Sequence, residues 1–194
     1  MKPVKIQNII KYISLVVVIS LSLNAAKKDL TIHLIGDSTM ADKPIDDNPE
    51  RGWGQVFPLF FTQDIEIVNY ARNGRSTKSF INQGLWKGVK DNLKEGDYVF
   101  IQFGHNDQKK SDTTRFAAPH TDYRKNLIKF ITEPFEKGAT PVLITPVNRR
   151  KFDHETFEFI DQLGEYPKVV RELAMEYDVP LIDLHKRSMN YLKH

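Results

Sequence analysis

Short apolar runs alternate with longer amphipathic stretches from residue 30 to the end of the chain. Each run is nearly continuous in branched and aromatic residues, which is typical of a strand that a parallel sheet buries on both faces. The stretches between the runs are long enough for helical crossovers between parallel strands. The predicted strands cover residues 30–35, 65–70, 98–103, 140–144 and 179–182.

Two of the intervening stretches carry apolar residues near helical spacing and are predicted to be helices that cover the sheet. These residues are Tyr123, Leu127, Phe130, Ile131 and Phe135 in the stretch 121–137, and Val169, Val170, Leu173 and Met175 in the stretch 166–177. No internal repeat or linker interrupts the pattern. We therefore expect one α/β domain over residues 27–194, with ligands bound beyond the carboxyl ends of the strands.

The first 26 residues have a different pattern, which is that of an export signal. Three lysines and no acidic residue lie in this segment, whose apolar run at 12–23 is too short to span a bilayer comfortably. Ala25 and Ala26 follow as small residues at which cleavage is expected. An uncleaved membrane anchor or a buried helix is the alternative. The segment predicts export to a periplasm or the extracellular space, without stable membrane association after cleavage.

Composition narrows the possible functions. The chain has 28 basic and 25 acidic residues, and removal of the three N-terminal lysines leaves equal numbers of both. Without a basic surplus, binding to nucleic acid is disfavoured. The absence of cysteine excludes disulfides, thiolate metal sites and cysteine nucleophiles. The histidines are scattered and form no His-x-x-x-His or Glu-linked cluster, which disfavours a metal-dependent hydrolase.

Polar residues follow three of the predicted strands where each strand ends. Ser38 comes after Gly36-Asp37, where we expect a sharp turn that places the serine at the N-terminus of a following helix. Taken alone, Asp37 or Ser38 could simply cap that helix. Met40 stands where the nucleophile elbow of the α/β-hydrolases has its closing glycine, so that motif does not fit.

The second and third strands end in Asn73-Gly74 and in Gly104-His105-Asn106-Asp107. Each of these segments alone is ordinary turn or loop chemistry. Together with the serine they place a hydroxyl, a glycine N–H and an amide at the same edge of a parallel sheet. Acyl transfer needs such a set, because the nucleophile requires donors that hold the developing oxyanion.

These segments resemble the first three conserved blocks of the SGNH (GDSL-like) hydrolases. The fuller sequences 36–40, 52–54, 73–80 and 100–107 are similar to the rhamnogalacturonan acetylesterase branch of that family. The resemblance implies a flavodoxin-like three-layer α/β/α fold with a five-stranded parallel sheet, and removal of acetyl groups from acetylated pectic polysaccharide without a cofactor. It assigns Ser38 as nucleophile and oxyanion N–H, with Gly74 N–H and the Asn106 side chain as further donors. Candidate sugar contacts, each equally open to a packing role, are Trp53, Arg75, Lys78 and Trp86.

The family's fourth block, an Asp-x-x-His that supplies the catalytic base, has no match in this sequence. Asp183-Leu184-His185 has the wrong spacing and lies in the fifth strand region, so His185 is a weak candidate. We interpret His33 as a core histidine and His105 as loop support, and find no partnering pattern at the remaining histidines, His120, His154 and His194. We therefore expect a chain that stops before its base and lacks the final helix, with part of one sheet face uncovered and little esterase activity.

Two other functions stay open from the sequence. A catalytically inactive relative could retain carbohydrate binding, and the same scaffold could hydrolyse lipid or short-chain esters. The segments Gly52-Trp53-Gly54 and 73–76 favour a carbohydrate over a lipid.

Overall fold

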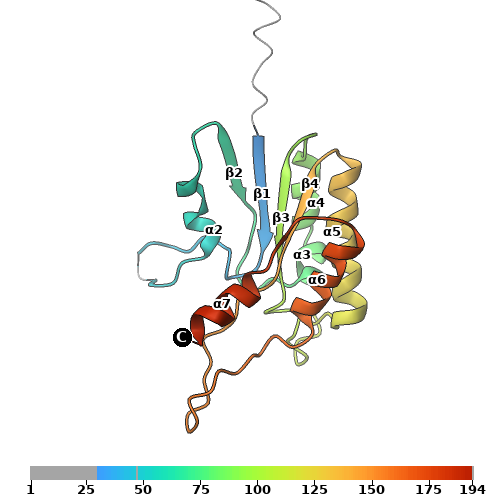
Figure 1. Cartoon of the computed structure of the whole chain (residues 1–194). Coiled ribbons are helices and arrows are strands. Elements are labelled where there is room, and N and C mark those ends of the chain that lie inside the picture. Colours follow the sequence, from blue (N-terminus) through green and yellow to red (C-terminus); the bar gives the residue numbers. More distant parts are fainter. Residues whose placement is uncertain (1–29, 47, 194) are drawn as a thin grey trace, which may run out of the picture.

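The computed structural model describes residues 30–46 and 48–193 and contains a parallel five-stranded sheet (Figure 1). The strands are β1 (Leu30–Gly36), β2 (Ile65–Asn69), β3 (Tyr98–Gln102), β4 (Thr140–Ile144) and β5 (Leu181–Ile182). All five predicted strands are confirmed, although β5 is two residues long and begins later than predicted. The predicted export signal, residues 1–26, lies outside the described residues. Among the described residues, no helix is both long and apolar enough to cross a membrane.

The strand order β2-β1-β3-β4-β5 places β1 in the interior of the sheet, between β2 and β3. The chain passes from β1 to β2 on one side and then crosses to β3 on the other. This reversal opens a crevice at the carboxyl ends of the strands, where α/β sheets bind their ligands. The loops that follow β1, β2 and β3 are therefore neighbours, as the sequence predicted.

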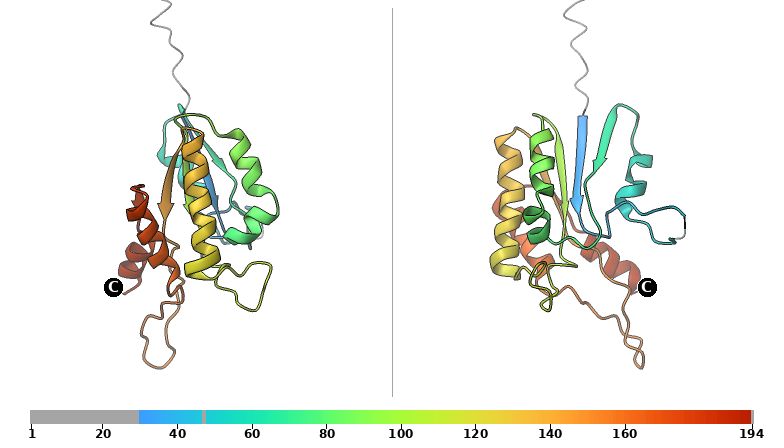
Figure 2. Two further views of the ribbon diagram at one scale, coloured as in Figure 1. Left: turned by 90° about the vertical axis from the view of Figure 1, so that its right-hand side faces the viewer. Right: turned by 180° about the vertical axis from the view of Figure 1, so that it is seen from behind.

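One face of the sheet is covered by four helices that share a large apolar core. They are α3 (Thr77–Asn82), α4 (Leu85–Asn92), α5 (Arg124–Glu136) and α6 (Tyr166–Glu176). The short π-helix η2 (Pro119–Tyr123) leads into α5, so the predicted helices 121–137 and 166–177 are both confirmed. Figure 2 shows α4 and α5 side by side on this face.

The opposite face carries much less structure. A short helix, α2 (Trp53–Val56), and the 3₁₀ turn η1 (Phe57–Phe60) pack there against a smaller apolar cluster. An apolar hollow of about 240 Å³ remains beside them, lined by Trp53, Phe57, Phe100, Ile144, Ile182 and Leu184.

The last helix, α7 (Leu184–Leu192), follows β5 directly, whereas we expected the closing helix to be missing. Nine residues suffice because the Asp183 carboxylate accepts a hydrogen bond from the Lys186 N–H and so caps the helix. The helix lies at the carboxyl end of the sheet (Figure 1), where Ser188 Oγ accepts from the Asn148 N–H at 3.0 Å. It therefore packs mainly against the loop after β4.

Two glycines should respond in opposite directions to alanine. A Cβ at Gly52 would lie 2.1 Å from the Ala41 carbonyl oxygen and 2.6 Å from the Met40 carbonyl carbon, so backbone must move. We expect Gly52→Ala to lower the free energy of unfolding by about 1–3 kcal/mol. Gly88 is exposed within α4, and nothing lies within 4 Å of the position that a methyl group would take. We expect Gly88→Ala to raise the free energy of unfolding by about 0.5–1 kcal/mol. Urea unfolding of both variants tests these two predictions, and equal changes in the free energy of unfolding would contradict them.

Candidate active site

The loop after β1 presents Ser38 on a turn that Asp37 closes. The Asp37 carboxylate accepts hydrogen bonds from the Thr39 N–H and hydroxyl, both at 2.9 Å, and its carbonyl accepts from the Ala41 N–H at 3.0 Å. Contrary to our expectation, Ser38 does not stand at the N-terminus of a helix, because the next helix, α2, begins only at Trp53. Asp37 bonds its own following backbone, which favours a turn over a helix.

Gly74 occupies the corresponding position after β2. Its φ of +77° is a left-handed conformation that glycine adopts without strain, while a Cβ there would find only the Arg115 guanidinium, at 3.6 Å. Glycine is thus required at this position by its backbone conformation. The neighbouring Asn73 side chain accepts a hydrogen bond from Lys43 Nζ at 2.7 Å, which ties this loop to the loop that follows Ser38.

Asn106, after β3, is buried and points its amide at the loop after β2. Its Nδ2 donates to the Arg75 carbonyl oxygen at 2.9 Å. An amide nitrogen carries two hydrogens, so a second donor remains. The hydrogen bond to Arg75 fixes the orientation of that second N–H.

Three donors in these loops have no acceptor within the described part of the chain. They are the backbone N–H of Ser38, the backbone N–H of Gly74 and the second N–H of the Asn106 side chain. The Ser38 hydroxyl likewise has no hydrogen bond to any residue in 30–46 and 48–193. A hydroxyl and a set of unused donors on adjacent loops can accommodate a developing oxyanion.

His105 joins the loops after β1, β3 and β4, in agreement with the predicted support of the loop. Its Nε2 donates to the Val147 carbonyl oxygen at 2.8 Å, because a carbonyl can only accept. Its Nδ1 lies 3.6 Å from the Asp37 carboxylate. Burial raises the pKa of Asp37, but the neighbouring His105, with the two hydrogen bonds from Thr39, outweighs it and lowers that pKa from its usual value of 3.8.

Asp107 is a second buried carboxyl in the same region. Its Oδ1 accepts from the Thr77 N–H at 2.9 Å, whereas its Oδ2 has no hydrogen-bond partner in the described residues. Burial raises the pKa of Asp107 from 3.8 to about 7; the Thr77 hydrogen bonds oppose this rise and the charge of Asp37 adds to it. The carboxyl therefore keeps its proton in the folded protein at pH values where the unfolded chain has lost it.

This pKa difference makes the stability depend on pH. As pH rises from about 4 to 7, the unfolded chain releases the Asp107 proton while the folded chain retains it, so the free energy of unfolding should fall. The penalty is complete above pH 7. Asp107→Asn stays neutral, so its melting temperature relative to the wild type should increase between pH 4 and 7 and then level off. A melting-temperature difference that does not depend on pH would contradict the raised pKa of Asp107.

A cavity of about 530 Å³ opens beside Ser38. Its walls are Ser38, Thr39, Lys43, Glu50, Arg51, Gly52, Trp53, Val56 and Val147. Of the proposed sugar contacts only Trp53 lines it, held by a hydrogen bond from its indole N–H to the Gln102 side chain. Sequence reasoning missed Lys43, which follows the nucleophile candidate by five positions in a loop without periodicity.

The other three proposed sugar contacts have different surroundings. Trp86 belongs to the core, 2% exposed, with its indole N–H donating to Glu133 at 2.8 Å, so of the two roles left open for this residue it has the packing role. Arg75 donates to Gln83 and to the Asn73 carbonyl, and Lys78 donates to the Thr113 carbonyl. Both side chains therefore stabilise loops through hydrogen bonds.

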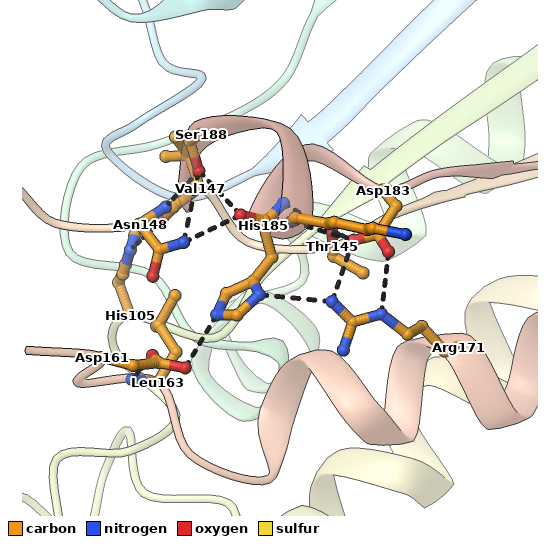
Figure 3. Close-up of polar contacts among 11 residues, drawn as sticks. His105, Thr145, Val147, Asn148, Asp161, Leu163, Arg171, Asp183, His185 and Ser188 are labelled. Carbon is orange, nitrogen blue, oxygen red and sulfur yellow. Dashed lines mark hydrogen bonds and ion pairs between the residues drawn. The ribbon is translucent and has the colours of Figure 1, made fainter. Parts of the chain in front are cut away.

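His185, the weak candidate for the base, is held by two partners (Figure 3). Its Nε2 lies 3.1 Å from the Asp161 carboxylate, and its Nδ1 lies 3.2 Å from an Arg171 guanidinium nitrogen. Because a guanidinium can only donate, Nδ1 accepts and the Nε2 proton is directed to Asp161. Asp183 pairs with the same Arg171 at 2.9 Å. Asp183 and His185 thus both hydrogen-bond to partners other than Ser38.

The remaining described histidines do not contact Ser38 either. His33 is buried and lies 3.2 Å from Asp97, which confirms a core role. His120 pairs with Glu165 at the surface and His154 is exposed. His194 lies outside the described residues. Within 30–46 and 48–193, no histidine ring hydrogen-bonds to the Ser38 hydroxyl.

A family model places these loops in a known context. The model of the GDSL-like lipase/acylhydrolase family matches residues 34–192, which include all three strand-end segments. The chain belongs to this family. The matched range includes Ser38, Gly74 and Asn106.

The GDSL-like chain is similar to two curated proteins of Bacillus subtilis (strain 168). It is 43% identical over 158 residues to rhamnogalacturonan acetylesterase RhgT, an alignment that covers 81% of this chain and 66% of that protein. It is 36% identical over 160 residues to probable rhamnogalacturonan acetylesterase YesY, covering 82% of this chain and 72% of that protein. The chain thus spans about two thirds of the length of RhgT.

Two solved structures share the fold of this chain. The structure of YxiM from Bacillus subtilis has a TM-score of 0.73 and 27% identity, covering 85% of this chain and 46% of that chain. The W215I variant of the acetyl xylan esterase Axe2 from Geobacillus stearothermophilus has a TM-score of 0.60 at 16% identity, covering 84% and 80%. At the latter identity the likeness concerns the fold alone.

Proposed function

We propose that this chain is a serine esterase that removes acetyl groups from acetylated pectic polysaccharide of the rhamnogalacturonan type. The observation that supports the proposal is that the Ser38 hydroxyl and three unused donors lie on the loops after β1, β2 and β3, at the same edge of the sheet. The names of RhgT and YesY support the substrate class. Three charged side chains, Lys43, Glu50 and Arg51, line the adjacent cavity beside apolar ones, and they favour a sugar over a long acyl chain.

The proposed reaction has two steps. Ser38 Oγ attacks the acetyl carbonyl carbon, and the carbonyl oxygen takes up negative charge beside the donors of Ser38, Gly74 and Asn106. The bond to the sugar oxygen breaks as that oxygen gains a proton, which leaves acetyl-Ser38. Water then attacks this ester, releasing acetate and returning the hydroxyl.

The proton of Ser38 needs an acceptor, and no described histidine hydrogen-bonds to this hydroxyl. A serine hydroxyl without a base is a weak nucleophile at neutral pH. We therefore expect the 194-residue chain to turn over slowly, and we expect added imidazole to raise its rate.

Acetate release tests the proposed function directly. The purified chain would be incubated with acetylated rhamnogalacturonan, acetylated xylan and a long-chain acyl ester, with and without imidazole, beside Ser38→Ala. We expect acetate from rhamnogalacturonan, more with imidazole, and none above background from Ser38→Ala. Release that persists in Ser38→Ala, or a preference for the long-chain ester, would refute the proposal.

A second function, carbohydrate binding without catalysis, is favoured by the absence of a histidine contact to Ser38 within the described residues. It predicts polysaccharide binding that survives Ser38→Ala, with no acetate released under any of the conditions above.

Export is part of the same proposal, because a polysaccharide substrate lies outside the cytoplasm. Residues 1–26 would serve as the signal peptide, with cleavage near Ala25 or Ala26. N-terminal sequencing of the protein recovered outside the cytoplasm tests this. An intact Met1 on the exported protein would contradict cleavage.

A further inference from the structure

Lys43 is a buried cation in the loop that follows the nucleophile candidate. Its side chain is 4% exposed, which is rare for lysine. The Gln55 side chain of α2 fixes its backbone from both sides, accepting from the Lys43 N–H at 3.1 Å and donating to the Lys43 carbonyl at 3.0 Å. The position of Lys43 is thus set by a helix that also forms the cavity wall.

The ammonium group of Lys43 has more donors than close partners. Nζ donates to Asn73 Oδ1 at 2.7 Å, and the Glu50 carboxylate lies 3.5 Å away with 73% of its side chain exposed. An ammonium carries three hydrogens, and 3.5 Å is long for an N–H···O bond. A buried ammonium is costly unless acceptors surround it. At least one hydrogen therefore lacks a close acceptor in the described residues.

Lys43 lines the cavity that contains Ser38, so an acceptor bound there can reach it. The second cation of the wall, Arg51, donates to the carbonyls of Ile45, Asn48 and Glu50, which uses three of its five N–H groups. Arg51 is exposed to solvent, so Lys43 is the buried cation of this wall with an unused hydrogen. Glu50 is exposed and held only loosely, so a ligand carboxylate can replace it at little cost.

We propose that Lys43 binds the carboxylate of an acidic sugar, a uronate, and thereby positions the acetylated sugar at Ser38. This inference rests on the proposed function and assigns its charge specificity to one residue. The ligand carboxylate takes over the hydrogens that Asn73 does not use. The selectivity for acidic over neutral glycans then originates at this ammonium.

Binding of unacetylated oligosaccharides tests the inference without requiring turnover. Trigalacturonate and the neutral xylotriose would be titrated calorimetrically into the 194-residue chain carrying Ser38→Ala, with and without Lys43→Met. Losing a charged hydrogen bond should weaken trigalacturonate binding about tenfold or more and leave xylotriose unchanged. The affinity for trigalacturonate should also fall with salt in the parent and much less in the Lys43→Met variant.

Matched variants distinguish an effect of the lost Lys43 charge from an effect of impaired folding. Lys87→Met removes the same charge from α4, where the side chain is 76% exposed, and should change neither affinity. Lys43→Arg keeps the charge and should retain the preference for trigalacturonate. If Lys43→Met melts too low for titration, the test relies on Lys43→Arg. Loss of the preference for trigalacturonate over xylotriose in that variant would overturn the inference.

Asn73→Ala leaves the Lys43 ammonium in place and removes its hydrogen bond to the loop that contains Gly74. If Lys43→Met and Asn73→Ala each lower the affinities for trigalacturonate and xylotriose equally, Lys43 acts by holding the loop and the inference is wrong. It is also wrong if the parent binds neither sugar or if Lys43→Met leaves trigalacturonate binding unchanged. Lys43-dependent binding without acetate release from any substrate would refute the esterase proposal and leave the carboxylate site standing.

Discussion

Asn106→Ala should slow acetyl release by about 10²–10³-fold, since an oxyanion donor typically contributes this much to the rate of acyl transfer. The amide is the one proposed donor on a side chain, so it alone can be removed by substitution without changing the backbone. Asn106→Asp retains the shape but replaces the donor with a group that repels an oxyanion, and should be slower still. Both rates would be measured as acetate release above the Ser38→Ala background.

The structure identifies the appropriate control for this substitution. Asn92, at the end of α4, donates to the Gly88 carbonyl on the exposed helix surface, so Asn92→Ala should leave the rate unchanged. Asn106 also holds the Arg75 carbonyl, so a melting temperature for each variant shows whether the loop remains folded. An Asn106→Ala rate within threefold of the wild type would remove this side chain from the proposed oxyanion hole.

Phe130→Ala should cost about 3–5 kcal/mol of unfolding free energy, the range for an aromatic residue removed from a packed core. Phe130 is completely buried on α5, and its ring centroid lies 4.8 Å from Trp86, 5.6 Å from Phe103 and 6.2 Å from Phe80. The substitution therefore leaves a cavity bordered by three other aromatic rings. Urea unfolding measures the loss.

Phe135 provides the matched control on the same helix. It is 47% exposed, so Phe135→Ala should cost about 1 kcal/mol or less. A Phe130→Ala loss as small as that of Phe135→Ala would mean that the aromatic cluster relaxes to fill the cavity. Since Phe103 immediately precedes the Gly104–Asp107 segment, such relaxation would also alter the support of Asn106.

The strands were predictable because parallel strands buried on both faces leave continuous apolar runs, as in residues 98–103. Helices α3 and α4 were not predicted. Each is short, and α4 buries only Trp86 and Val89 among polar neighbours, so its pattern is weak. For the same reason the sequence left Trp86 open between a sugar contact and a packing role, and the structure shows its indole in the core, donating to Glu133.

The strand-end loops were predictable as neighbours because the ends of parallel strands meet at one edge of the sheet. The turn at Ser38 was not, since it depends on the Asp37 side chain bonding its own backbone rather than on any periodicity. Lys43 was missed because its burial depends on Gln55 and Asn73, which are distant in sequence. Contacts of this kind leave no local pattern.

The interior position of β1 has a consequence for synthesis on the ribosome. This strand is made before every other strand of the sheet, yet its partners β2 and β3 end only at Asn69 and Gln102. Until the latter residue has emerged, a nearly completely buried strand keeps at least one edge open to pairing with other chains. The nascent chain is therefore most vulnerable to aggregation early in translation, when chaperone binding to residues 30–36 would protect it.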